Sequence, residues 1–280
     1  MSKLPGPVVF LSLLAFFVVV APRGEDNAAA QEEGIPERAR EMLASLEDAH
    51  FGEVKTGFSV LNAQDGFGNT RLTAWKVDPE KFRFQLVESD VKKGSHASWF
   101  LDHTHGLLAV NAGYFARNKD GSIYPVGFLK IDGTRRSSPW NAGTGGLLSF
   151  SGKEMSIHVP LPSKIDRSAI RNGLQSKPVM IEPGGKWAMR SNREILKNRT
   201  AVCLLPDKNV LIVTVSGRGL SLYELAVLMK KPDEDGFFGC EAAIALDGGS
   251  STQVAYALDP TLNVASLAPV QNALVVLDAE

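Results

Sequence analysis

Short apolar segments separated by chain-breaking residues run through most of this sequence and constrain its fold most strongly. From Gly52 onward, segments that alternate or are continuously apolar are bounded by Gly, Pro, Asn and Asp, which is typical of strands. We expect strands at 56–61, 71–77, 82–88, 107–110, 126–131, 147–150, 155–159, 179–181, 200–205, 210–215, 243–246, 253–258 and 273–277. Helices do not alternate regularly with these segments. The pattern therefore predicts an α+β fold, a single domain with mixed, mostly antiparallel β-sheets and few helices.

Helical patterns are few. The clearest covers residues 221–229, where Ser221 and Glu224 have the spacing of a capping box ahead of an apolar stripe. Residues 36–50 form a short amphipathic pattern that we expect to pack on the edge of the domain or lead into it. Another helix is possible near 166–172.

The first thirty residues resemble a secretory signal peptide. Lys3 precedes an apolar run at 8–21, and Ala28–Ala30 supplies small residues for a cleavage site. The run is short for a membrane span, although an uncleaved anchor is the alternative. We therefore expect a signal peptide at 1–30 and an exported protein, periplasmic or secreted, with no stable membrane span once processed.

Length and charge constrain the mature part of the chain. The sequence has 280 residues, which fits a lead-in at 31–52 and one domain at 53–280. Its formal net charge of −1 argues against a nucleic-acid partner, because phosphate contacts need a basic face. The two cysteines, Cys203 and Cys240, both have apolar neighbours, so a disulfide and two buried free thiols are both consistent with the sequence.

A carboxylate followed by two glycines and three hydroxyl residues is the clearest candidate site. The strand expected at 243–246 leads to Asp247, and the loop 248–252 comes next. Glycines let a backbone approach a ligand closely, and hydroxyl and N–H groups bind a phosphate or a sugar. A carboxylate beside them suits acid–base or nucleophilic chemistry. The loop alone is equally consistent with a tight turn in which Asp247 bonds its own backbone.

Three other segments place polar groups at the end or start of an expected strand. Asn111 ends one strand and is followed by Gly113 and Tyr114, a set that suits a sugar or phosphate. Arg199 opens another strand, where its planar fork can bind an anion. Ser176 lies in a polar turn that enters a strand through a proline. Taken singly, these segments also fit an Asx turn with core aromatics, a surface arginine and an ordinary turn.

Together and in this order, the four segments resemble the phosphodiester glycosidase family. The family elements are Asn-Gly-Gly/Ala-Gly-Tyr/Phe-Phe, Gln-Ser-Gly-Pro, Arg-Thr/Ser-Ala-Ile/Val-Gly and Leu-Asp-Gly-Gly-x-Ser-Ser/Thr. They correspond here to residues 111–115, 175–178, 199–202 and 246–252. The helix expected at 221–229 falls where the family has Leu-x-Glu-Leu-Ala, and the resemblance covers about residues 100–278.

Two residues depart from the family pattern. Lys177 stands where the family has glycine before proline, which can alter the rim of the pocket and so the substrate. Cys203 replaces the glycine after the arginine strand, a change that we expect to affect packing only.

The resemblance implies an exported hydrolase that cleaves a sugar-1-phosphodiester at the glycosidic C–O bond. The sugar would be N-acetylglucosamine or a related one, and the substrate a glycan phosphodiester of the cell envelope or an exopolysaccharide. No cofactor or metal is expected. The implied catalytic residues are Asp247, Arg199 and Asn111, and the implied substrate-binding residues are Gly113, Tyr114, Ser176, Gly248, Gly249, Ser251 and Thr252.

A second catalytic carboxylate is the missing part. Glycosidases normally use two. Asp102, Asp120, Asp132 and Glu182 lie near the four segments in sequence, and nothing in the sequence separates them. One carboxylate can suffice if the leaving group is a phosphomonoester, because that group is already stable as an anion.

Other functions fit parts of the same pattern. His103 and His105 would share one face of a strand, but two ligands without a third favour exposed or capping histidines over a metal site. An exported glycan-binding module would keep the aromatics and the glycine loop without needing Asp247. A phosphodiesterase or phosphatase would cut the P–O bond instead of the C–O bond.

Overall fold

The computed structural model of the chain describes residues 34–66, 68–140, 145–159 and 169–279. The predicted signal peptide at 1–30 lies outside these residues. Within them, no helix has both the length and the apolar character that a membrane span requires.

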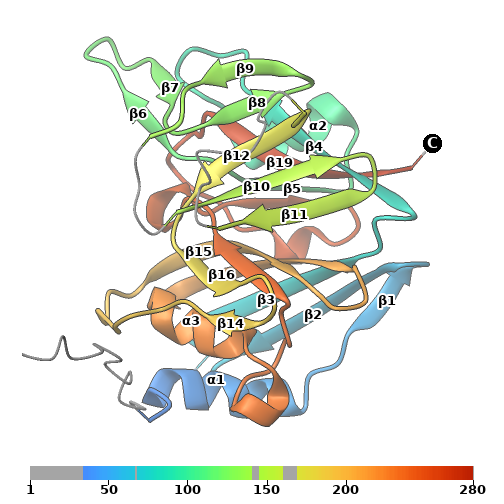
Figure 1. The fold of residues 1–280 in the computed structure, drawn as a ribbon, viewed down its shortest axis with the longest axis vertical. Coiled ribbons are helices and arrows are strands. Elements are labelled where there is room, and N and C mark those ends of the chain that lie inside the picture. Colours follow the sequence, from blue (N-terminus) through green and yellow to red (C-terminus); the bar gives the residue numbers. More distant parts are fainter. Residues whose placement is uncertain (1–33, 67, 141–144, 160–168, 280) are drawn as a thin grey trace, which may run out of the picture. The chain divides into compact units, whose positions relative to one another are not determined.

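The largest sheet of the described residues has eight strands in the order β1-β2-β3-β16-β15-β17-β13-β14, with antiparallel neighbours (Figure 1). Its strands are β1 (Gly52–Lys55), β2 (Phe58–Gln64), β3 (Thr70–Val77), β13 (Val179–Glu182), β14 (Lys186–Trp187), β15 (Lys197–Leu204), β16 (Val210–Leu220) and β17 (Ala242–Ala245).

Two smaller sheets and a hairpin, also antiparallel, complete the strands of the described ranges. The four-stranded sheet, in the order β18-β5-β19-β4, consists of β4 (Phe82–Glu88), β5 (Leu108–Asn111), β18 (Val254–Tyr256) and β19 (Asn272–Asp278). The five-stranded sheet, in the order β11-β10-β12-β8-β9, consists of β8 (Leu129–Ile131), β9 (Thr134–Ser137), β10 (Gly146–Ser151), β11 (Glu154–His158) and β12 (Asn172–Ser176). The hairpin pairs β6 (Phe115–Arg117) with β7 (Ile123–Pro125).

Three α-helices and three short 3₁₀ turns belong to the same described part. They are α1 (Glu37–Glu47), α2 (Ala97–Thr104), α3 (Leu222–Met229), η1 (Pro232–Glu234), η2 (Gly249–Ser251) and η3 (Pro260–Leu262). The predicted α+β fold with mostly antiparallel sheets and few helices is confirmed.

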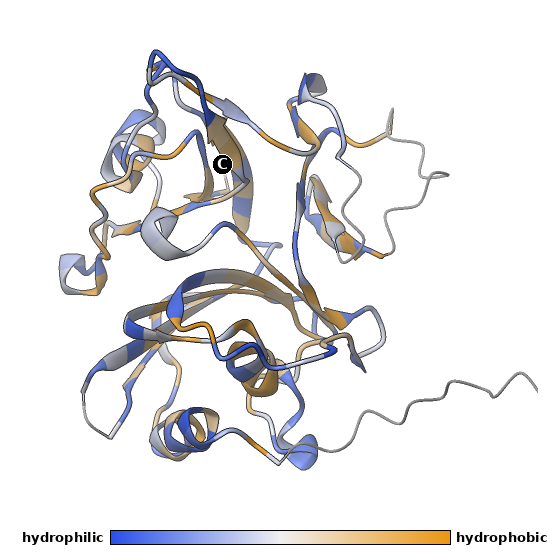
Figure 2. Cartoon of the chain, turned by 90° about the vertical axis from the view of Figure 1, so that its left-hand side faces the viewer, coloured by the Kyte–Doolittle hydropathy of each residue, from blue (hydrophilic) through white to orange (hydrophobic). Residues whose placement is uncertain are grey.

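The eight-stranded sheet separates two hydrophobic cores, because side chains alternate between its faces. Val202 and Ile212 face a core shared with the two smaller sheets, whereas Cys203 and Val213 face the core beneath α1 and α3. Figure 2 shows hydrophobic residues concentrated on these strands and on the helix packed against the sheet. Fully burying one such aliphatic side chain contributes about 1.5–3 kcal/mol, so both faces stabilise the position of the central strands.

The capping box predicted for the helix at 221–229 is confirmed. The Ser221 hydroxyl accepts from the Glu224 N–H at 3.1 Å, and a Glu224 carboxylate oxygen accepts from the Ser221 N–H at 2.7 Å. The described end of the helix considered near 166–172 is not helical, because Asn172 begins β12 and pairs with Phe150 of β10. The rest of that segment lies outside the described residues.

The placement of His103 and His105 on a strand was wrong. His103 lies in the last turn of α2, and His105 ends that helix in the left-handed conformation, with φ of 53°. Residues two apart do not share a helix face, so the two imidazoles do not converge. Both side chains are exposed, and the described residues contain no cluster of His, Cys, Asp or Glu that could hold a metal ion.

Cys203 of β15 and Cys240, just before β17, form a disulfide with a Cα–Cα distance of 5.6 Å. The structure thus decides between the two states that the sequence left open. The bond closes a loop with a sequence separation of 37 residues beside two central strands of the large sheet.

Replacing both cysteines with Ala is expected to lower the free energy of unfolding by roughly 2–4 kcal/mol, because the loop is then unconstrained in the unfolded chain. Urea unfolding of the oxidised wild type and the double variant measures the difference. Equal midpoints and slopes for the two proteins would contradict this role of the disulfide.

Candidate active site

Strand ends from all three sheets meet around Asp247. Asp247 follows β17, whose neighbour β15 carries Arg199, and Asn111 ends β5 of the four-stranded sheet. The Asp247 N–H donates to the carbonyl of Ala112 at 3.0 Å, which joins the two sheets at this point. Ser176, the last residue of β12 in the five-stranded sheet, is buried and donates to the carbonyl of Ala245 at 2.5 Å.

Asn111 lies at the centre of this junction, and its side-chain amide is occupied by the protein itself. Its Nδ2 donates to the carbonyl of Asp247 at 2.6 Å. Its Oδ1 accepts from the Thr200 hydroxyl at 2.7 Å and from the Gln253 N–H at 3.2 Å. The side chain is also buried. The structure therefore favours a positioning role for Asn111, holding the Asp247 backbone, over contact with a sugar or phosphate.

The Asp247 carboxyl group is half-buried and held by its own loop. One carboxylate oxygen accepts from the Gly248 N–H at 2.9 Å. Burial raises the pKa of Asp247 above its ordinary value, while a hydrogen bond with Ser251, the Gly248 N–H and the charge of Lys197 act in the opposite direction. Desolvation disfavours the charged carboxylate, so the Asp247 carboxyl group keeps its proton to a higher pH than a solvated aspartate does.

Tyr114 connects Asp247 to the rest of the site. Its hydroxyl donates to the carbonyl of Lys177 at 2.8 Å. Burial, followed by the charge of Asp247, raises its pKa to about 12, against the lowering effects of Arg199 and of a hydrogen bond with Ser176. The phenol thus stays protonated at neutral pH. Tyr114, Asp247, Arg199 and Ser176 are brought together as the sequence led us to expect.

Arg199 is partly desolvated and fixed by backbone carbonyls. Its Nε donates to Leu220 at 2.9 Å and one terminal nitrogen donates to Ile195 at 2.6 Å. Burial lowers its pKa, and the nearby Tyr114 phenol and Glu224 carboxylate act to raise it. Arginine remains protonated in such settings. In the described ranges it forms no ion pair with Asp247, so it provides a positive charge that a bound anion can use.

The geometry of the Asp247 loop favours glycine at two positions. Gly249 has φ of 65°, a left-handed conformation that disfavours other residues. A Cβ atom on Gly248 would lie 3.0 Å from the carbonyl oxygen of Asn198. Gly113, in the neighbouring segment, donates its N–H to the Asn272 side chain at 2.7 Å. Gly113 therefore helps to fix the junction, and its N–H is not available to a ligand.

The four candidate second carboxylates are bonded to other groups or exposed in the described residues. Asp120 is bonded to Ser122 in the β6–β7 hairpin, and Glu182 lies 3.8 Å from the Lys186 ammonium. Asp102 and Asp132 are exposed on α2 and after β8. Within the described residues, no hydrogen bond or ion pair links any of these four to Asp247 or Arg199.

Sequence reasoning missed three contributors. The charge of Glu224 raises the pKa of Arg199. The Glu224 carboxylate is buried, accepts from the Ser221 N–H and pairs with Arg38 at 2.9 Å. The charge of Lys197 lowers the pKa of Asp247. Its position two residues before Arg199 on the same strand could have indicated that it lies near the site. Trp140, whose ring centroid lies 5.6 Å from that of Tyr114, had no signal in the sequence.

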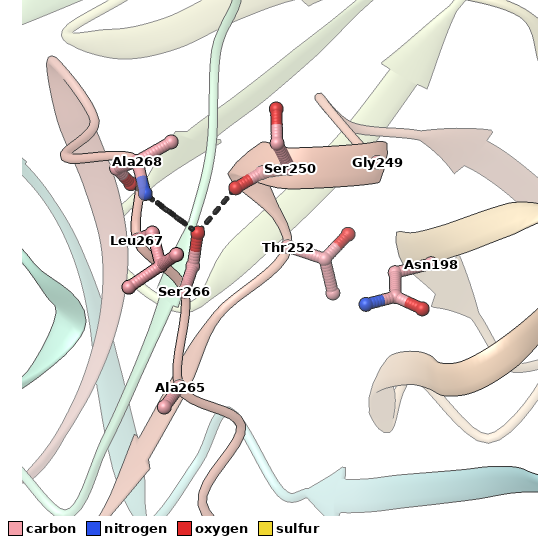
Figure 3. A pocket seen from close by; sticks show the side chains of 8 residues that line it. All are labelled: Asn198, Gly249, Ser250, Thr252, Ala265, Ser266, Leu267 and Ala268. Carbon is pink, nitrogen blue, oxygen red and sulfur yellow. Dashed lines mark hydrogen bonds between the residues drawn. The ribbon is translucent and has the colours of Figure 1, made fainter.

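Thr252 lies on another side of the same loop. Its hydroxyl is buried and has no hydrogen-bond partner among the described residues. It lines a cavity of about 420 Å³ together with Asn198, Gly249, Ser250 and residues 265–268 (Figure 3). Ser266 donates to the carbonyl of Ser250 across this cavity. Asp247, Arg199 and Tyr114 do not line it, so the cavity adjoins the candidate site without including its charged groups.

If Asp247 is catalytic, as the resemblance implies, the pH dependence of turnover is expected to follow its ionisation. If the ionised form is needed, kcat falls as pH decreases through the Asp247 pKa, and burial places this acid limb above the ordinary range of aspartate. Since Lys197 lowers that pKa, Lys197→Met is expected to move the limb to higher pH, whereas Lys153→Met, at an exposed lysine paired with Glu80, leaves it in place. If the acid limb of kcat in Lys197→Met is unchanged or moves to lower pH, Lys197 does not lower the pKa of Asp247.

Comparisons with known proteins concern the family and the fold of the chain. The family model described as phosphodiester glycosidase matches residues 105–277. No curated protein matches the sequence. The catalytic domain of zebrafish N-acetylglucosamine-1-phosphodiester alpha-N-acetylglucosaminidase, auto-inhibited by its pro-peptide, is 14% identical with a TM-score of 0.56, and the match covers 83% of each chain.

Two further solved structures share the fold. A hypothetical protein from Synechocystis has a TM-score of 0.57 and 14% identity over 82% of this chain, which spans 64% of that protein. A protein from Burkholderia pseudomallei K96243 has a TM-score of 0.55 and 13% identity over 74% of each chain. Since the family model covers more than half of the sequence, the chain belongs to the phosphodiester glycosidase family.

Proposed function

We propose that the chain hydrolyses a sugar-1-phosphodiester at the glycosidic C–O bond, with N-acetylglucosamine or a related sugar as the glycone. The observation that supports this most is the half-buried Asp247 carboxyl group, placed with Arg199 around Tyr114 at the ends of two adjacent strands. The zebrafish relative's name describes action on an N-acetylglucosamine-1-phosphodiester, which is the basis for the sugar.

In the proposed reaction, the bond between the anomeric carbon and the phosphate oxygen breaks. That oxygen keeps the electron pair and leaves as part of a phosphomonoester, whose second pKa near 6 makes protonation unnecessary at neutral pH. Arg199 stabilises the negative charge on the phosphate. Asp247 acts as the nucleophile, as the base that removes a proton from water, or as the group that stabilises an oxocarbenium-like centre. The oxygen of water ends on the anomeric carbon.

A single carboxylate can suffice for the proposed reaction, because the leaving phosphomonoester is already stable as an anion. A leaving alkoxide would need a general acid, which is the usual task of a second carboxyl group. A phosphomonoester leaving group is already stable as an anion and needs no such acid, which makes a phosphodiester the substrate that we propose for this site.

The export of the protein is part of the proposal. The Cys203–Cys240 disulfide supports it, because such bonds form and persist in oxidising compartments. A glycan phosphodiester of the cell envelope or of an exopolysaccharide is the expected substrate in that location.

A screen of sugar-1-phosphodiesters with the purified chain tests the proposal. We expect one or more substrates to release free sugar and phosphomonoester in equal amounts. Binding without turnover across the panel would favour the glycan-binding module, and release of sugar phosphate with free alcohol would favour a phosphodiesterase. Either outcome would contradict the proposed activity.

A further inference from the structure

Lys177 stands beside the candidate site and is held in place by an aromatic ring. Its side chain is exposed, and its Nζ lies 5.3 Å from the centroid of the Trp140 ring. A cation over a ring face at this distance is attracted by the ring quadrupole. The Trp140 ring in turn packs edge-to-face on Tyr114, with centroids 5.6 Å apart. The Lys177 ammonium thus contacts Trp140, which packs on Tyr114. Asp247 and Arg199 both influence the pKa of Tyr114.

Trp140 is itself anchored to the scaffold. The backbone N–H of Trp140 donates to the side-chain oxygen of buried Gln175 at 3.0 Å. The side-chain nitrogen of Gln175 donates to the backbone carbonyl of Trp140 at 2.8 Å. The ring packs against Gly127 so closely that a Cβ atom there would lie 2.5 Å from it. The position of the Trp140 ring beneath the Lys177 ammonium is therefore set by the fold.

The backbone of Lys177 is also part of the site. Its carbonyl accepts the hydrogen bond from Tyr114 at 2.8 Å, and the preceding residue, Ser176, influences the pKa of Tyr114. The ammonium therefore projects from the segment that borders the Tyr114 phenol. In the proposed function Arg199 supplies a positive charge for the scissile phosphodiester, so a second cation at this border exceeds what one phosphodiester needs.

We propose that Lys177 is a specificity-determining residue that binds a second anionic group of the substrate, a phosphate beyond the scissile phosphodiester. The inference rests on the proposed function and narrows its substrate class to sugar phosphodiesters that carry further phosphate, such as chains of repeated phosphodiesters. Its effect is on binding, because the ammonium lies at the border of the site and has no part in breaking the C–O bond.

Two substrates and matched variants test this. The first substrate is the methyl diester of N-acetylglucosamine 1-phosphate, and the second carries a 2-phosphoethyl group in place of methyl. We expect KM of the wild type to be about tenfold lower for the second, as one charge-assisted contact provides. Lys177→Met is expected to remove most of this preference with little change in kcat. Lys177→Arg is expected to retain it.

The control is Lys230→Met. Lys230 has the same kind of contact elsewhere, with its Nζ 5.7 Å from the Trp187 ring centroid, so its loss reports any general effect of removing a stacked lysine. We expect it to keep the wild-type preference. Higher salt is expected to reduce the preference of the wild type and of Lys230→Met, since exposed charges are screened. An analogue with a carboxyethyl group shows whether a carboxylate can replace the second phosphate.

Binding of both diesters to Asp247→Asn, measured by calorimetry, separates this inference from the proposed activity. A preference that depends on Lys177 in binding, without turnover by the wild type, would support the inference and contradict the activity. Turnover with no preference for the phosphorylated analogue, or with a preference that Lys177→Met retains, would overturn the inference and leave the activity standing.

Discussion

Replacing Asp247 with Asn is expected to lower kcat on a sugar-1-phosphodiester by roughly a thousandfold or more, because the carboxylate that we propose as catalytic is lost. The substitution preserves shape, and its remaining carbonyl oxygen can still accept from the Gly248 N–H. The fold is expected to survive. Turnover assays together with circular dichroism measure both effects.

The stability of this variant has a predictable sign. Burial raises the pKa of Asp247 in the folded chain, so folding favours the protonated carboxyl group. The associated stability is present below the unfolded pKa and lost as pH rises through the folded one. At neutral pH the ionised carboxylate therefore opposes folding, and a neutral Asn is expected to leave stability unchanged or increase it.

Asp120→Asn, at an exposed carboxylate, is the matched control and should keep full activity. Wild-type turnover by folded Asp247→Asn would remove Asp247 from the mechanism.

Replacing Asn111 with Ala is expected to lower the free energy of unfolding by roughly 3 kcal/mol or more, because it leaves buried groups of three partners without hydrogen bonds. These partners are the Asp247 carbonyl, the Thr200 hydroxyl and the Gln253 N–H. The folded protein is also expected to lose about a hundredfold in kcat, since a small displacement of Asp247 is enough for that. Urea unfolding and turnover of the same preparation measure both effects.

A graded variant tests whether Asn111 acts through position. Thr200→Val removes one of the three hydrogen bonds and leaves the one between Asn111 and the Asp247 carbonyl in place. It should destabilise the protein by about 1 kcal/mol and lower kcat far less than Asn111→Ala. An Asn111→Ala variant with normal stability and kcat would contradict the positioning role. A large rise in KM with unchanged kcat would instead restore the direct contact with substrate that the sequence suggested.

Local patterns in the sequence were sufficient for most of the fold. The strand expected at 82–88 is β4 in full, and the capping box at Ser221 begins α3 as predicted. Both depend on neighbours along the chain. The helix α2 was not expected, because its apolar residues Trp99, Phe100 and Leu101 are consecutive and give no helical spacing. It is stabilised instead by packing of Phe100 against β5 and β19.

Proximity of the candidate site residues was easier to predict from the sequence than their contacts. Asp247, Arg199 and Ser176 do lie together around Tyr114, because each of the three stands near the end or start of a strand. The sequence could not show that the Asn111 side chain donates to the Asp247 carbonyl, since that hydrogen bond joins residues 136 positions apart. Trp140 was missed for the same reason: it reaches Tyr114 only through its anchoring by Gln175.

Hydrolysis in water enriched in heavy oxygen tests the central claim most directly. The proposed reaction breaks the bond between the anomeric carbon and the phosphate oxygen, so mass spectrometry is expected to find the label in the released sugar and none in the phosphomonoester. Asp247→Asn, which should give no turnover, controls for hydrolysis by contaminating enzymes. Label in the phosphate would show that the P–O bond is cut and would contradict the assignment of this chain as a glycosidase.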